Sequence, residues 1–142
     1  MSLEERNVVI GLALGVTAFI VYWAVVIARA ATDGAPFTQV AWQGPMLWTL
    51  VIGGGFYALT YGVARWRLRG TRATDERDAQ VLLHADSASG GLTGIAVLAT
   101  LIMLTLDASP FWVAHVLFVG AFLGSVAGSG VAIAGYREGL AS

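Results

Sequence analysis

The chain has 142 residues, of which 57% are hydrophobic and only 12% are charged, and its formal net charge is −1. A soluble domain of this size does not need so much apolar surface, so the composition excludes an ordinary globular domain and predicts helices that face lipid. The chain has no cysteine, which excludes disulfides, thiolate metal sites and cysteine nucleophiles.

Four apolar segments follow one another, each near or above the roughly 20 residues that a helix needs to cross a bilayer. A backbone in lipid must satisfy its own hydrogen bonds, so these segments are predicted to be helices. The expected fold is an all-α, integral membrane four-helix bundle that forms one domain over residues 1–142. The helices are predicted over about residues 8–31, 45–66, 75–106 and 110–136.

Turn and cap residues agree with these bounds. Gly34 follows the first predicted helix and is expected to be its C-cap. Gly44 and Pro45 open the second helix. Ser109 and Pro110 precede the fourth apolar segment, and we expect them to be the N-cap and the first residue of that helix.

The arginines are concentrated between the second and third helices, in residues 65–86. The other two connectors carry Asp33 and Asp107. Because basic residues favour the cytoplasmic side, residues 65–86 are predicted to form a cytoplasmic loop and an extension of the third helix, with both termini inside (N-in/C-in). Four arginines of this loop are expected to contact lipid headgroups: Arg65, Arg67, Arg69 and Arg72.

An acidic motif begins the third helix, and it consists of Asp75, Glu76, Arg77 and Asp78. One interpretation is structural, because carboxylates in a first turn oppose the positive end of the helix dipole. The functional hypothesis is a docking surface for a protein partner. A metal site is not predicted, since Glu76 and His84 lie eight positions apart, or about 12 Å along a helix axis.

Small residues recur at helical spacing on three of the predicted helices. Small side chains let helices in lipid approach closely, so these positions are predicted to pack helices within one bundle or, alternatively, between two copies of the chain. They are Gly11, Gly15, Gly91, Gly94, Gly120, Gly124 and Gly128, with Gly135 continuing the last stripe.

Two further polar positions lie toward the other membrane surface. Arg29 and Asp107 are predicted to form an ion pair that closes the outer end. His115 is interpreted as a hydrogen-bonding residue near the membrane interface rather than as a pH-sensitive group.

No Asp, Glu, Lys or Arg occurs in the middle of a predicted helix, where ion-coupled transporters usually carry such a residue. The sequence also lacks a phosphate-binding glycine loop and histidines that could pair on haem. We therefore expect a protein that is not an enzyme, that has no cofactor and no metal, and that does not bind nucleic acid directly.

Several segments carry a resemblance when they are taken in order. They are SLEERNVV, GPMLWT, TDERDAQV, SPFWVAHVLFVGAFLGSVAG and YREGL. Together they resemble a family of small bacterial membrane proteins of unknown function, with four predicted helices and a D-E-R-D motif in the cytoplasmic loop. The resemblance covers nearly the whole chain and implies its topology. We expect a multi-pass protein of the bacterial plasma membrane. In that family a more charged stretch often follows the motif, where this chain has Val81, Leu82 and Leu83.

The function predicted from these features is a non-enzymatic, regulatory or accessory membrane protein whose cytoplasmic loop binds a partner. The alternative is a small oligomeric transporter or channel subunit. A dry, glycine-packed interior would favour the first. A wet cavity would favour the second, and its lining would include Thr17, Tyr22, Thr60, Tyr61, Thr93 or Ser125. A third interpretation, an immunity-type protein that protects the membrane, is not separated from the first by any residue.

Overall fold

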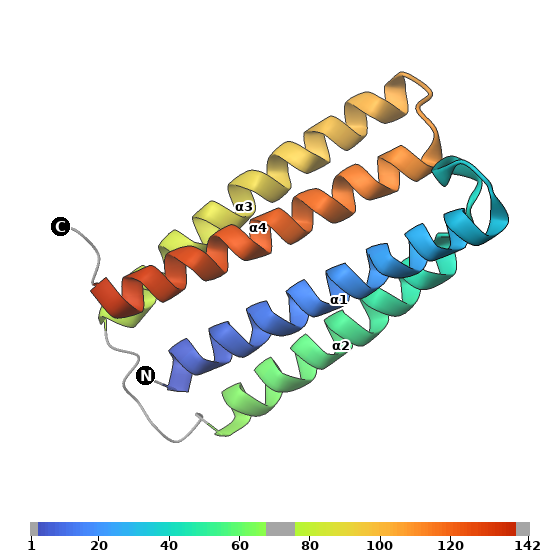
Figure 1. The fold of residues 1–142 in the computed structure, drawn as a ribbon. Helices are drawn as coiled ribbons and strands as arrows, with labels where there is room; N and C mark the ends of the chain where they lie inside the picture. Colours follow the sequence, from blue (N-terminus) through green and yellow to red (C-terminus); the bar gives the residue numbers. More distant parts are fainter. Residues whose placement is uncertain (1–2, 68–75, 139–142) are drawn as a thin grey trace. The chain divides into compact units, whose positions relative to one another are not determined.

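A computed structural model describes residues 3–67 and 76–138, with side chains over 5–55, 58–59 and 80–137. Within these residues the structure is all-α and contains no strand, as predicted (Figure 1). The helices are α1 (Leu3–Asp33), α2 (Gln43–Arg67), α3 (Glu76–Thr105) and α4 (Pro110–Glu138), and a short 3₁₀ turn, η1 (Phe37–Gln39), precedes α2.

Two helices begin earlier than predicted. The start of α1 at Leu3 places Glu5 in the first turn, where a carboxylate is favoured by the helix dipole. In α2 the Met46 N–H donates to the Trp42 carbonyl at 3.0 Å, so the helix opens before Pro45. Proline is tolerated there because N–H groups of a first turn have no partner within the helix.

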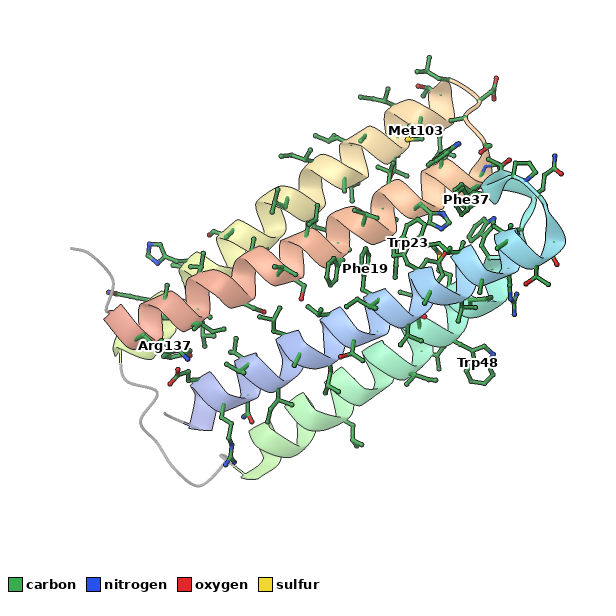
Figure 2. The ribbon with its side chains drawn as sticks, viewed as in Figure 1. Phe19, Trp23, Phe37, Trp48, Met103 and Arg137 are labelled. Atoms are coloured by element: carbon green, nitrogen blue, oxygen red, sulfur yellow. The ribbon has the colours of Figure 1, made fainter. Side chains whose placement is uncertain are left out.

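Among the described residues, three helical segments are long and apolar enough to cross a membrane: Glu5–Asp33, Gln80–Thr105 and Pro110–Arg137, with 29, 26 and 28 residues. Each exceeds the roughly 20 residues that a bilayer core of about 30 Å requires. Large apolar side chains are widely exposed on them and on α2, where Trp48 is 67% exposed and points away from the ribbon (Figure 2). These features indicate a membrane protein. In the predicted span of α2, the side chains of residues 56–57 and 60–66 lie outside the described set.

The chain divides into two compact parts. The first contains the start of α1, up to Leu12, together with α3 and α4. In this part α3 and α4 lie side by side and antiparallel (Figure 1). Their core cluster consists of Val81, Ala85 and Ala132, and the partly buried hydrophobic residues packed against it are Val8, Val131 and Tyr136. The first turns of α1 therefore pack against the α3–α4 hairpin.

The second part contains α1 from Ala13, the connector and α2. Gly34 follows α1 with a φ of 58°, which confirms the predicted C-cap, since glycine adopts this left-handed conformation without a steric penalty. The Arg29 Nη1 donates to the Ala41 carbonyl at 2.6 Å. This bond ties the end of the connector to the last turns of α1.

The turn between α3 and α4 closes through two backbone bonds at the end of α3. The Ala108 N–H donates to the Met103 carbonyl at 3.0 Å, and the Asp107 N–H donates to the Leu104 carbonyl at 3.3 Å. This pair of bonds defines a Schellman motif, whose C′ residue is usually glycine. Here that residue is Asp107, with a φ of 52°, and α4 then begins at Pro110 as predicted.

The left-handed conformation of Asp107 generates a stability prediction. Replacing Asp107 by glycine removes the Cβ that opposes this conformation, so Asp107→Gly should raise the free energy of unfolding by about 1 kcal/mol. Asp107→Ala also removes the carboxylate but keeps the Cβ, and it should give no gain. Reversible unfolding in mixed micelles, followed by circular dichroism, measures both; equal effects of the two variants would contradict the prediction.

Candidate functional site

The helices α3 and α4 lie very close together at glycines of α4. A Cβ added at Gly124 would lie 2.5 Å from the Thr93 Oγ1 and 2.7 Å from the Ser89 carbonyl oxygen. A Cβ added at Gly128 would lie 2.9 Å from the Ala85 carbonyl oxygen. At both positions, therefore, the α4 backbone touches α3 directly, as small residues permit between helices in lipid.

The same face continues toward both ends of the hairpin. A Cβ at Gly120 would overlap the Cβ of Ala96, and one at Gly135 would lie 2.9 Å from both Cγ atoms of Val81. The contact thus runs from Gly120 to Gly135 along α4 and from Ala96 to Val81 along α3. Over about four turns, the two helices therefore lie close together.

The other glycines of the predicted packing stripes do not make such contacts. A Cβ at Gly11, Gly15, Gly91 or Gly94 would have no described heavy atom within 4 Å. Gly91 and Gly94 are exposed, and the residues of α3 that meet α4 lie on a different face. The predicted packing role of these four glycines, within one bundle or between two copies, stays a prediction.

Two buried polar side chains of the hairpin, Thr100 and His115, are bonded to carbonyls of their own helices. The Thr100 Oγ1 donates to the Ala96 carbonyl at 2.8 Å. The Nδ1 of the buried His115 lies 2.6 Å from the Phe111 carbonyl, and because a carbonyl only accepts, Nδ1 must carry the proton. The His115 ring also stacks on Phe111, with 3.9 Å between centroids. This geometry agrees with the interpretation of His115 as a hydrogen-bonding residue.

The hairpin has a charged end, which we define as the start of α1, the start of α3 and the end of α4. Here the Arg137 Nε donates to the Glu5 Oε1 at 2.8 Å. The Glu5 side chain is 9% exposed and the Arg137 side chain is 61% exposed. Figure 2 shows Arg137 at the end of α4 that lies away from the turn. The pair brings the beginning of α1 and the end of α4 to the same end of the hairpin.

Sequence reasoning missed this ion pair. The first helix is predicted to begin at about residue 8, after Glu5, and the fourth to end at about residue 136, before Arg137. One signal was present, since Glu5 and Val8 lie one helical turn apart and so share a face. Extending the first helix by five residues would have put both on the surface that packs against α3 and α4.

The eight residues of the predicted docking and headgroup sites have no described side chains. Asp75, Arg69 and Arg72 lie outside the described residues. Glu76, Arg77 and Asp78 begin α3, and Arg65 and Arg67 end α2, but their side chains are not described.

The remaining site predictions concern the outer end and metal binding. Arg29 and Asp107 belong to the two different parts of the chain, so their predicted ion pair stays a prediction. In the part of the chain that the structure describes, no group of three His, Asp or Glu side chains could hold a metal ion.

Comparisons with known proteins give no assignment: no family model, no curated protein and no solved structure matches the chain. The resemblance to the small four-helix bacterial family stays a prediction. The function must therefore be argued from the chain's own geometry.

The glycine contacts predict unequal effects of the same substitution on two helices. Gly124→Ala forces a Cβ against the Ser89 carbonyl and should lower the free energy of unfolding by about 1–3 kcal/mol, as overpacking typically does. Gly91→Ala adds a better helix former in open space and should not destabilise. Unfolding in mixed micelles compares the two variants. A loss at Gly91 as large as that at Gly124 would show that Gly91 also makes a close contact.

The ion pair predicts an asymmetry between its two partners. Arg137→Gln removes the countercharge from a carboxylate that is mostly buried, and it should lower the free energy of unfolding by about 1–3 kcal/mol. Glu5→Gln should cost less, because the Arg137 side chain is already largely solvated. Arg6→Gln, an exposed neighbour, should stay within about 0.5 kcal/mol of the parent. A larger loss for Glu5→Gln than for Arg137→Gln would show that the buried carboxylate does not depend on its countercharge.

Proposed function

We propose that the chain is a non-enzymatic protein of the bacterial plasma membrane with a regulatory or accessory role, and that it binds a cytoplasmic partner through the start of α3. The observation that carries the proposal is the backbone contact of α3 with α4, which runs from Val81 opposite Gly135 to Ala96 opposite Gly120. This contact fixes the direction of α3.

The length of α3 supports the same proposal. Its 30 residues extend for about 45 Å, while the hydrocarbon core of a bilayer is about 30 Å thick. About ten residues of α3 would then project beyond the core. The charged residues of α3 all lie between Glu76 and Asp86, so the projecting residues are those at the N-terminal end of the helix.

The chemistry of this end favours a basic protein surface as the partner. Asp75, Glu76 and Asp78 are close together in the sequence at the start of α3. Carboxylates that bind arginine or lysine form charge-assisted hydrogen bonds, which are stronger than neutral ones. A helix that is already fixed by its neighbour loses little conformational entropy on binding, and such preorganisation favours affinity.

The tight hairpin also favours the accessory role over transport. Between α3 and α4 the Ser89 carbonyl and the Thr93 hydroxyl lie against the Gly124 backbone, so no room remains there for a file of water. Thr17, which would line a transport path, donates to the Ala13 carbonyl of its own helix at 2.8 Å. In the alternative, a small oligomeric transporter or channel subunit, the path would have to lie elsewhere.

A matched pair of variants tests the proposal in native membranes. Asp75→Ala with Asp78→Ala removes two carboxylates from the start of α3, and Asp33→Ala with Asp107→Gly removes two from the other connectors. Crosslinked partners are quantified by mass spectrometry after purification. The first variant should lose a partner at least about tenfold, given charged hydrogen bonds of about 1.5–3 kcal/mol each, and the second should retain it.

Membrane insertion of both variants provides the control. If both variants capture the same partner equally, the docking hypothesis fails. If the parent chain purifies as a homo-oligomer without a partner and supports solute flux in vesicles, the transport alternative takes its place.

A further inference from the structure

We propose that Arg137 binds the phosphate of an anionic phospholipid at the charged end of the hairpin. The first observation concerns where the membrane-spanning segments end. In the sequence, Glu5 precedes the apolar run of α1 and Arg137 follows the apolar run of α4, and these two residues are joined by the 2.8 Å ion pair. The polar flanks of two apolar segments thus meet at one end of the hairpin, where we place the lipid headgroups.

The second observation is the way in which Arg137 is held. A guanidinium group carries five N–H donors in a planar fork that matches phosphate oxygens. Glu5 accepts from the Nε of this fork, and the Arg137 side chain is 61% exposed. The mostly buried Glu5 therefore helps to fix the orientation of the group, and this bond leaves the N–H donors of the two terminal nitrogens unused.

The third observation is a row of exposed apolar residues on α4, on the membrane side of Arg137, which we call the track. Ala134, Gly130 and Leu123 are exposed, and they lie three, seven and fourteen positions before Arg137, which places all four on one helix face. A Cβ at Gly130 would have no described atom within 4 Å. We expect an acyl chain below the headgroup to follow this track, since the small residues at 134 and 130 let it approach the helix backbone.

The track distinguishes a lipid from a free phosphate ion. Both would offer the same oxygens to Arg137, but only a lipid gains from the apolar face below. Glu5 neutralises part of the positive charge, so the site should discriminate between lipids by geometry as well as by charge.

The test uses the full chain, extracted with phosphatidylglycerol or phosphatidylcholine and examined by native mass spectrometry for retained lipid. Arg137→Gln alone would leave the mostly buried Glu5 carboxylate without its countercharge. The comparison is therefore made in the Glu5→Gln background. Glu5→Gln should retain more phosphatidylglycerol than the parent, because it removes the neighbouring negative charge. Glu5→Gln with Arg137→Gln should retain about fivefold less than Glu5→Gln alone, the factor that corresponds to about 1 kcal/mol for one basic residue near an anionic surface.

Three controls decide the outcome. Glu5→Gln with Arg6→Gln removes one positive charge at a position next to residue 5. A loss of phosphatidylglycerol retention equal to that of the Arg137 variant would overturn the proposal, since net charge alone would then explain retention. Gly130→Leu should lower phosphatidylglycerol retention by filling the track. Displacement of the retained lipid by inorganic phosphate at millimolar concentration would overturn the lipid assignment, as would an equal effect of the Arg137 substitution on phosphatidylcholine.

Discussion

The contact between α3 and α4 depends on the absence of side chains at four positions of α4. Helices in lipid gain little by burying apolar side chains against each other, because the lipid tails they displace are equally apolar. Dispersion and weak Cα–H···O contacts remain, and both require that the backbones approach closely. Gly124 and Gly128 permit this approach to the carbonyls of Ser89 and Ala85. The core cluster around Val81 and Ala132 forms at the end of the same contact, and the start of α1 packs on that cluster through Val8.

The charged end is stabilised by an arrangement of helix ends as well as by one ion pair. Glu5 lies in the first turn of α1, where the helix dipole is positive, and Arg137 lies in the last turn of α4, where it is negative. Each charge interacts favourably with its own helix end, typically by about 0.3–1 kcal/mol, before the two interact with each other. The burial of Glu5 makes the pair specific, since a mostly buried carboxylate needs a partner in place. This explains how a short polar segment before the apolar span can be part of the folded structure.

Helix number and approximate bounds could be predicted because they follow from the lengths of apolar segments and from local caps such as Gly34 and Pro110. The pairing of faces could not. A periodic pattern shows which residues share a helix face, but a glycine stripe needs only small side chains and accessible carbonyls opposite it. On α3 that partner face carries Ala85, Ser89 and Ala96 rather than Gly91 and Gly94, so two glycine stripes need not meet. The Glu5–Arg137 pair joins residues 132 positions apart, and no local signal links them.

The proposed partner surface at the start of α3 and the proposed lipid site at Arg137 both depend on the contact between α3 and α4. Val81 of α3 meets Gly135 of α4, and Gly135 is two residues from Arg137. The start of α3 lies about five residues before Val81, which corresponds to roughly 7.5 Å of helix rise. A partner on the acidic start of α3 would therefore bind close to the lipid headgroup at Arg137. The charges of the two surfaces are opposite in sign, so an anionic lipid and a basic partner would attract each other across this distance. Any resulting cooperativity must be reciprocal: if the lipid strengthens binding of the partner, the partner strengthens binding of the lipid by the same factor. A rigid hairpin suits this role, because it keeps the separation of the two surfaces constant while neither contact requires the membrane-spanning segments to move.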